Sequence, residues 1–328
     1  MKIYKQSIVY ILCPPKYATG GTELLHQLCD ALLKIKIQAK IFYWPQVDNP
    51  TNEQFKEYKI DVALKIEDDS KNIFIAPEID NYKIFEYEEI QKGIWWLSID
   101  NHFKNIKIRK TSFKVRFMDF FLRRTYFDLN TPETNSVIHF AQSNYAKTFL
   151  ENKGLKNIEL LSDYINNRFL EGKFDTDIKE DIILYNPKKG IDYTRKLIEF
   201  SKGKLNWIPI ENLTRDGVFD LLKRAKVYVD FGNHPGKDRF PREAAALGCC
   251  VVTNKKGSAG NIDDVSIPTK FKFNGSESDI STIIDTLENC IVNYQDIILE
   301  FKKYREGILN EKDLFLSQVE RNFNPSDR

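Results

Sequence analysis

The sequence predicts an α/β protein with two domains, each containing a parallel sheet. Strand-like and helix-like patterns alternate along most of the chain, which is typical of parallel sheets covered by helices on both faces. The alternation lapses once, around residues 162–180. The 328 residues also exceed the roughly 250 that a single hydrophobic core usually serves. We therefore expect two Rossmann-like domains, 1–165 and 166–328, that face a cleft at the carboxyl ends of their strands.

The first domain opens with a strand, a loop and a helix. The apolar, β-branched run at 7–13 predicts a buried strand, which the glycine-containing loop 14–21 follows. Leucines then recur at helical spacing and predict a helix over 22–35, with Thr22 as its N-cap. The rest of this domain is predicted to contain strands at 38–44, 62–66, 72–77, 93–99 and 136–143, and a helix at 143–154.

A second series of strands and helices follows the lapse. Strands are expected at 181–187, 205–210, 226–232 and 249–254, and helices at 192–202, 214–225 and 242–248. Pro241 is expected to open the last of these helices, with Glu243 in its first turn. Apolar residues at helical spacing over 279–322 predict closing helices.

The composition is that of a folded, globular protein in which any basic surface must be local. The 49 lysines and arginines nearly balance the 47 acids, so the net charge of +2 does not favour nucleic-acid binding. The five cysteines lack C-x-x-C spacing, which argues against a disulfide framework or a zinc site and fits a reducing compartment. No stretch approaches the ~20 apolar residues of a membrane span. We expect a cytoplasmic protein.

The loop at 232–243 has the clearest chemical character. It follows the strand at 226–232, and a helix N-terminus there offers free N–H groups to an anion. Its candidate anion-binding residues are His234, Gly236, Lys237, Arg239 and Arg242. The alternative is that the arginines pair with Asp238 and Glu243 and only stabilise a turn.

Two further loops follow predicted strands. Lys188 and Lys189, after the strand at 181–187, can reach a pyrophosphate, although paired lysines are also common in solvated turns. Gly20 and Gly21 allow a ligand to approach the backbone before the first helix. That glycine pair belongs to neither a dinucleotide fingerprint nor a P-loop, so by itself it also fits a tight turn.

Together these stretches resemble a known superfamily. PPKYATGGTELLHQLCDAL, at 14–32, resembles the first loop and helix of glycosyltransferases with the GT-B fold. KKG and VYVDFGNHPGKDRFPREAAALGCCVV, at 188–190 and 227–252, are similar to the sugar-nucleotide half of the same superfamily, most of all in poorly characterised bacterial polysaccharide-biosynthesis proteins. The resemblance implies a nucleotide-diphosphate sugar as donor, no tightly bound cofactor, and an acceptor on the N-terminal domain.

Position by position, the resemblance also implies roles for individual residues. Lys189 would bind the diphosphate, Glu243 the nucleotide ribose, and Gly20 and Gly21 would lie beneath the transferred sugar. Many retaining members carry a second acid eight residues before the helix glutamate, where this chain has Pro235. Retention or inversion at the sugar is therefore left open.

The reaction requires fixed positive charge for the leaving diphosphate, and we expect Lys189 and Arg239 to supply it. An inverting transfer would also need a general base. Asp100, expected at the end of a first-domain strand, is the preferred candidate and His102 the alternative, although a lone acid there also caps turns. No acid or histidine cluster has metal-ligand spacing, so no metal is expected.

The segment 101–127 carries eight basic residues and one acid among aromatic residues. It fits a patch that contacts a membrane surface, a surface for an acidic glycan, or an ordinary solvated face with its aromatic residues in the core.

The leading hypothesis is a bacterial glycosyltransferase of capsule or lipopolysaccharide synthesis, which moves a sugar to a cell-surface glycan or lipid-linked acceptor. It would work in the cytoplasm or peripherally at the inner membrane. Two alternatives remain: another enzyme on the same scaffold, such as a nucleotide-sugar epimerase or a transferase of a phosphorus-containing substituent, and a non-catalytic scaffold that binds nucleotide sugars.

Overall fold

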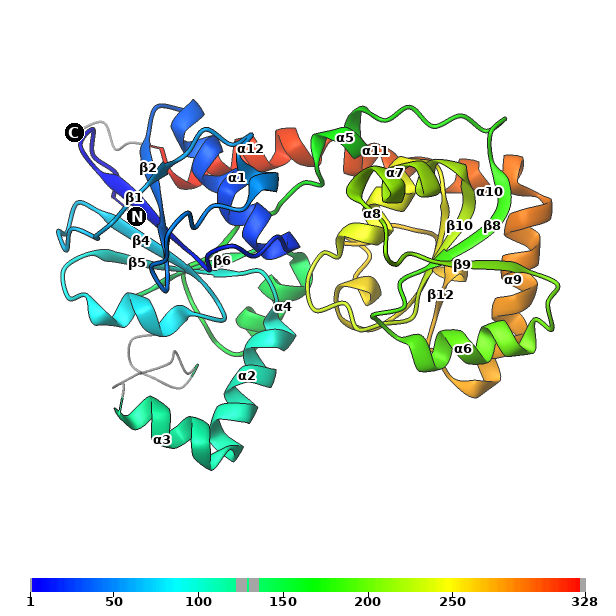
Figure 1. Cartoon of the computed structure of the whole chain (residues 1–328), viewed down its shortest axis with the longest axis horizontal. Helices are drawn as coiled ribbons and strands as arrows, with labels where there is room; N and C mark the ends of the chain where they lie inside the picture. The colour runs from blue at the N-terminus through cyan, green and yellow to red at the C-terminus, as the bar shows by residue number, and fades with distance from the viewer. Residues whose placement is uncertain (1, 122–128, 130–135, 325–328) are drawn as a thin grey trace. The chain divides into compact units, whose positions relative to one another are not determined.

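The computed structural model describes residues 2–121, 129 and 136–324, which form two compact units (Figure 1). Unit 1 comprises residues 1–163 and 313–328, and unit 2 comprises residues 164–312. The predicted second domain, 166–328, includes the C-terminal residues 313–328, whereas in the structure these residues belong to unit 1.

Unit 1 has a seven-stranded parallel sheet in the order β3-β2-β1-β4-β5-β6-β7. The strands are β1 (Ile8–Cys13), β2 (Gln38–Tyr43), β3 (Asp61–Val62), β4 (Ile73–Pro77), β5 (Gln91–Trp96), β6 (Ile138–Ala141) and β7 (Ile158–Leu160). In the centre Ile11 lies opposite Ile41 and Ile75, and all three are fully buried. From β1 the strand order runs outward in both directions, so the loops after β1 and β4 diverge at one point of the carboxyl edge.

Helix α1 of unit 1 begins at another residue than expected. The helices are α1 (Gly20–Lys34), α2 (Ile99–Thr111), α3 (Phe113–Phe121), α4 (Asn144–Asn152) and α12 (Glu311–Asn322), whose first two residues still belong to unit 2. Thr19 caps α1, and its hydroxyl accepts the Thr22 N–H while the Thr22 hydroxyl accepts the Thr19 N–H. The prediction of Thr22 as N-cap is thus wrong, because the reciprocal pair starts the helix three residues earlier.

Unit 2 has a five-stranded parallel sheet in the order β12-β11-β10-β8-β9. Its strands are β8 (Glu180–Tyr185), β9 (Asn206–Pro209), β10 (Ala225–Asp230), β11 (Cys250–Asn254) and β12 (Lys272–Phe273). Its helices are α5 (Asn167–Glu171), α6 (Ile191–Phe200), α7 (Arg215–Arg224), α8 (Arg239–Ala246), α9 (Ile280–Val292), α10 (Tyr294–Glu300) and α11 (Lys302–Leu309). Here the strand order diverges from β8, which lies between β9 and β10.

Helix α8 begins earlier than predicted. Asp238 is its N-cap and Arg239 its first residue, so Pro241 is the third residue of the helix and does not open it. Glu243 consequently lies beyond the first turn, which contains no acid.

The C-terminal helix α12 returns to unit 1, where it is drawn in red among the blue and green elements (Figure 1). Phe323, directly after the helix, stacks on Phe140 of β6 with ring centroids 5.5 Å apart. The Ser162 N–H donates to Gln318 Oε1 at 2.7 Å, and Asn322 Nδ2 donates to the Leu160 carbonyl at 2.9 Å. The C-terminal residues therefore pack against β6 and the segment after β7, near the middle of the chain.

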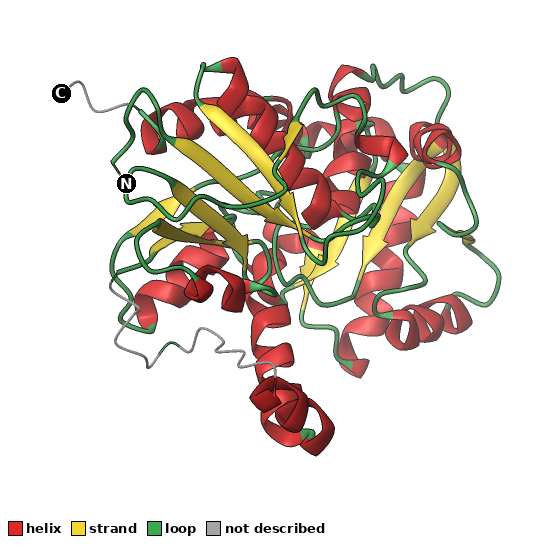
Figure 2. Cartoon of the chain, turned by 60° about the vertical axis from the view of Figure 1, so that its left-hand side comes forward, coloured by secondary structure: helices red, strands yellow, loops and turns green. Residues whose placement is uncertain are grey.

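Helices α2 and α3 project from the sheet of unit 1 (Figure 2). They contain the described part of the basic, aromatic segment 101–127, of which residues 122–127 lie outside the described residues. Within the ranges that the structure describes, no helix combines the length and the apolar character that a bilayer crossing requires.

Candidate functional site

The loops after β8 and β10 meet at the divergence point of the unit 2 sheet, where open α/β sheets bind ligands. Two glycines allow this contact. Gly190 has a φ of +60°, and a Cβ there would lie 2.5 Å from the Gly232 nitrogen. A Cβ at Gly232 would lie 2.7 Å from the Cβ of Lys189. The glycines thus bring Lys189 against the loop that begins at Gly232.

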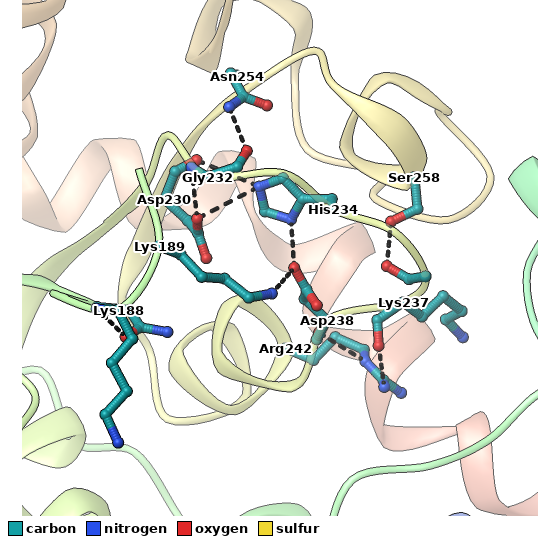
Figure 3. A network of polar contacts seen from close by, with 12 residues as sticks. Lys188, Lys189, Asp230, Gly232, His234, Lys237, Asp238, Arg242, Asn254 and Ser258 are labelled. Carbon is teal, nitrogen blue, oxygen red and sulfur yellow. Dashed lines mark hydrogen bonds and ion pairs between the residues drawn. The ribbon is translucent and has the colours of Figure 1, made fainter. Parts of the chain in front are cut away.

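A network of charged side chains occupies this junction (Figure 3). The Lys189 ammonium lies 2.7 Å from Asp238 Oδ2, and His234 Nδ1 lies 2.9 Å from the same oxygen. On the other side of the imidazole, His234 Nε2 lies 3.5 Å from Asp230 Oδ1. Asp230 in turn accepts the Gly232 N–H and the Tyr228 hydroxyl, each at 3.0 Å. The network therefore contains two carboxylates and two basic groups.

The acids around His234 favour its charged form. Burial alone would lower the pKa of His234, but the hydrogen bond to Asp238 and the charge of Asp230 outweigh it and raise this pKa above its usual value. Burial would likewise raise the pKa of Asp238, yet His234 and Lys189 hold it below its usual range. The geometry fits an imidazolium whose Nδ1 donates to the Asp238 carboxylate, while Nε2 lies 3.4 Å from the Asp230 carbonyl oxygen and 3.5 Å from the Asp230 carboxylate.

Asp230, His234 and Asp238 are also the one group of three metal-ligating side chains found among the described residues, with ligand atoms within 4.8 Å of one another. Their arrangement fits a metal poorly, because the two imidazole nitrogens face different carboxylates. A cation would also have to compete with Lys189 for Asp238. The group is better described as a hydrogen-bonded ion-pair network.

Two of the predicted anion-binding residues form ion pairs within unit 2. Arg242 is only 1% exposed, and its guanidinium lies 2.7 Å from Glu311 Oε2 and donates to the carbonyls of Lys237 and Asp238. The Lys237 ammonium lies 2.8 Å from Glu311 Oε1. Both side chains thus hold the loop against the first residue of α12. The alternative weighed from the sequence paired the arginines with Asp238 and Glu243, whereas the ion-pair partner of Arg242 is Glu311.

Arg239 and Lys188 remain nearer to solvent. Arg239 contacts the buried carboxylate of Glu243 at 3.1 Å, one turn along α8. Lys188 is exposed, and its side chain extends away from the network (Figure 3). Of the two adjacent lysines, the structure brings Lys189 into the network.

The turn after β11 supports the same loop from behind. Ser258 Oγ donates to the Gly236 carbonyl at 2.5 Å, and the Ser258 N–H donates to the His234 carbonyl at 2.9 Å. Gly257 has a φ of +57°, and a Cβ there would lie 2.0 Å from the His234 carbonyl oxygen. The backbone that carries His234 and Gly236 is therefore fixed at this turn.

In unit 1 the corresponding divergence point lies between β1 and β4. Helix α1 begins there with Gly20 and Gly21, and a Cβ at Gly21 would meet Leu97 Cδ1 at an ordinary 3.6 Å. Packing within the unit thus does not require a glycine at position 21.

Glu78, directly after β4, is a further candidate site residue, and the sequence patterns above do not predict it. It is buried and accepts the Leu97 N–H at 3.0 Å, and burial raises its pKa to about 8. The signal in the sequence is a polar residue ending an apolar strand, but only the strand order places it beside β1.

Of the two proposed general bases, His102 contacts Glu78. The prediction that Asp100 ends a strand is wrong, because β5 ends at Trp96 and Asp100 lies in the first turn of α2, where it accepts the Tyr145 hydroxyl at 2.9 Å. His102 is buried, with Nδ1 at 3.2 Å from the Glu78 carbonyl and its ring edge-to-face with Trp96.

Comparison with known proteins yields structural matches only. No protein-family model and no curated protein sequence matches the chain. Among solved structures, sucrose-phosphate synthase from Thermosynechococcus elongatus matches with a TM-score of 0.63 and 10% identity, over 97% of this chain and 99% of that one. WaaG, a glycosyltransferase involved in lipopolysaccharide biosynthesis, matches with a TM-score of 0.60 and 11% identity, over 97% and 98%. HepE from Anabaena, solved with UDP and glucose, matches with a TM-score of 0.53 and 12% identity, over 97% and 98%.

These matches cover both units in order, and the structures they match are GT-B glycosyltransferases. Two parallel-sheet α/β units in succession agree with that architecture. The chain has the GT-B fold.

Proposed function

We propose that this protein is a glycosyltransferase that uses a nucleotide-diphosphate sugar as donor. The observation that carries the proposal is the position of Lys189 at the divergence point of the unit 2 sheet, in a chain with the GT-B fold. HepE, one of the matched structures, was solved with UDP and glucose, which supports a nucleotide-sugar donor.

The chemistry of the step explains why a lysine at this point matters. Breaking the bond between sugar and diphosphate places negative charge on the leaving phosphate, and a preorganised cation stabilises that charge. Lys189 is held there by the close contact of two glycine-containing loops. In this proposal Arg239 assists from α8, and Glu243 holds the ribose once Arg239 turns toward the phosphate.

Arg242 and Lys237 have a supporting part in this proposal. Because Glu311 binds both side chains, they fix the loop and leave phosphate binding to Lys189 and Arg239.

On the acceptor side, we propose that Gly20 and Gly21 form the floor beneath the sugar. Asp100 is preferred to His102 as the base for an acceptor hydroxyl, because His102 is buried against Trp96 whereas Asp100 is half-buried at the start of α2. A cell-surface glycan or a lipid-linked acceptor fits the basic, aromatic character of the helices that follow.

The first experiment is a thermal-shift screen against UDP, GDP, ADP, CMP and their common sugar conjugates. A ligand at about 100 times its Kd stabilises the folded protein by about 2.7 kcal/mol. The nucleotide that stabilises is then tested for donor hydrolysis and for transfer to glycan acceptors. Affinity without turnover would instead favour a binding protein.

Lys189→Ala with Lys188→Ala as its matched control tests the proposed site. We expect Lys189→Ala to weaken nucleotide-diphosphate binding by at least about tenfold, since a charge-assisted contact is lost. Lys188→Ala removes an equal charge one residue away and should leave affinity within about twofold. Equal effects of the two substitutions would remove Lys189 from its proposed role.

We also propose that α2 and α3 bring the enzyme to an anionic membrane surface in the cytoplasm. Four phenylalanines of α3, Phe113, Phe117, Phe120 and Phe121, are 81%, 57%, 79% and 66% exposed, and no residue of α3 is buried. Exposed lysines and an arginine accompany them, at Lys104, Lys107, Lys110, Lys114 and Arg116. Aromatic residues that enter the headgroup region, together with basic residues that attract anionic lipid, characterise interfacial helices.

Sedimentation with phosphatidylglycerol vesicles and with phosphatidylcholine vesicles tests this contact. We expect binding to the anionic vesicles at low salt, weakened by salt and by the substitutions Phe117→Ser and Phe120→Ser. Leu299→Ser, which changes an exposed apolar residue of α10, is the control. Failure of the unmodified protein to bind at low salt would remove the membrane contact while leaving the donor site untouched.

A further inference from the structure

In the structure, the cation assigned to the donor phosphate already has an anionic partner. The Lys189 ammonium lies 2.7 Å from Asp238 Oδ2, a distance that a phosphate oxygen would also take. A diphosphate that binds Lys189 must therefore compete with a carboxylate of the same chain.

Asp238 makes this contact instead of the hydrogen bond that an aspartate at a helix N-cap usually accepts. It is the N-cap of α8, where an aspartate usually accepts an N–H of the first turn, but its side chain makes no such cap hydrogen bond. Its carboxylate turns instead to Lys189 and to His234 Nδ1 (Figure 3).

His234 fixes the carboxylate in that position. It is 1% exposed, and the charged groups that face it are Asp230 at the end of β10, Asp238 before α8, and Lys189 from the loop after β8. Asp230 is itself held by the Gly232 N–H and the Tyr228 hydroxyl. A chain of contacts thus runs from β10 through Asp230, His234 and Asp238 to Lys189.

We propose that the Asp238 carboxylate competes with the donor diphosphate for the Lys189 ammonium. Protonated His234 is the positioning residue, because it keeps its contact with Asp238 when the diphosphate binds Lys189. The proposal rests on the function proposed above. With His234 protonated, the four groups carry no net charge, so a diphosphate meets a balanced site. With His234 neutral, the site carries one additional negative charge and repels the diphosphate.

Two effects on binding follow. Affinity for a nucleoside diphosphate falls as the pH rises and His234 loses its proton. Asp238→Asn, which keeps the shape but removes the competing charge, tightens binding on the order of five- to tenfold.

Calorimetric titration with UDP, GDP and ADP over the range from about pH 5.5 to about pH 8.5 measures both effects. The variants are Asp238→Asn and His234→Gln. Asp216→Asn is the control, because it removes a carboxylate that pairs with Arg168 at the surface. The terminal phosphate of each nucleotide titrates near pH ~6, and the His234→Gln series separates that contribution from the effect of His234.

A second measurement needs no ligand. The chain has four histidines, so side-chain 15N spectra can follow each one, with His234→Gln identifying the signals of His234. Asp238→Asn and Asp230→Asn should each move the titration midpoint of His234 to lower pH, because each removes a carboxylate that faces the imidazole. Unchanged midpoints in both variants would overturn the coupling.

The outcomes separate this inference from the proposed function. If the unmodified protein binds a nucleotide and Asp238→Asn binds it no more tightly, internal competition is excluded while the donor site stands. If only Asp238→Asn binds, the competition is stronger than expected and is supported. If neither protein binds any of the three nucleotides, the donor site fails, and this inference fails with it.

Discussion

Glu78 is a single residue whose chemistry depends on the whole sheet around it. It lies at the carboxyl end of β4, buried, with the Leu97 N–H as a donor to its carboxylate. The hydrogen bonds from backbone N–H groups lower its pKa, but burial outweighs them and raises it to about 8. Near neutral pH the folded protein therefore holds a proton on Glu78 that the unfolded chain releases.

This proton makes stability depend on pH. The pKa of Glu78 in the folded state, about 8, exceeds its ordinary value of 4.5, so unfolding releases a proton between these pH values and stability falls as the pH rises. We expect the stability of the unmodified protein to decline by about 4 kcal/mol across that range, and we expect Glu78→Gln to remove this decline. Urea unfolding at several pH values measures it.

Glu89→Gln, at an exposed position after the same strand, is the control and should leave the decline intact. If the unfolding free energies of the unmodified protein and of Glu78→Gln changed with pH in the same way, Glu78 would be ionised in the folded state.

The residues of the candidate site differ in how far the sequence reveals them. Lys189, Gly20 and Gly21 stand in local patterns after strands, so they could be named from the sequence. Glu78 and the pairing of Asp238 with Lys189 could not, because they depend on which strands are neighbours and on burial. Glu311 as the partner of Arg242 lies 69 residues away along the chain, beyond any local pattern.

At the scale of elements, most strands could be predicted and several helix ends could not. The strands of a parallel sheet that is buried on both faces are continuous apolar runs in the sequence. Such runs clearly predict β1, β4 and β10. Helix starts depend on which of several polar residues turns its side chain to the backbone, and α1 and α8 both begin earlier than expected. The sequence indicates α2 and α3 only as a basic, aromatic segment, because few of their residues are buried and apolar periodicity is weak.

The start of α1 yields a test of the glycine pair. Gly21→Ala meets only an ordinary contact with Leu97 and occupies a helical position, where alanine is favoured over glycine by up to about 1 kcal/mol. We expect an unchanged or raised Tm together with a loss of sugar transfer of at least about tenfold, since the added methyl group occupies ligand space. Full activity would show that the ligand does not approach this turn.

Gly257→Ala is expected to lower the Tm, in contrast to Gly21→Ala. A Cβ there collides with the His234 carbonyl at a positive φ, so both Tm and nucleotide binding should fall.

At the scale of the molecule, the two units differ in how the chain forms them. Unit 2 is one continuous segment, whereas unit 1 requires residues 313–328 from the far end. Phe315, Val319 and Phe323 are fully buried in or directly after α12, and Phe323 stacks on Phe140.

Phe323→Ala should therefore destabilise unit 1 by about 3–5 kcal/mol, the usual range for removing a buried phenylalanine. Hydrogen exchange followed by mass spectrometry should show faster exchange in β6 and β7 and unchanged exchange in β8 and β10. Leu314→Ala, at a half-exposed position of the same helix, is the control. Faster exchange in both units would indicate that they unfold together.

The return of α12 also sets an order of events during translation. The strands of unit 1 leave the ribosome first, but the residues that complete their core follow only after all of unit 2 has been synthesised. At about 5–20 residues per second, this leaves Phe140 and its neighbours without their C-terminal partner for roughly 10 s or more. A nascent chain in that interval exposes apolar surface to chaperones, and unit 2 has all of its residues before unit 1 does. A fragment that ends at residue 163 would remain in that state permanently, whereas residues 164–312 carry every strand of their own sheet.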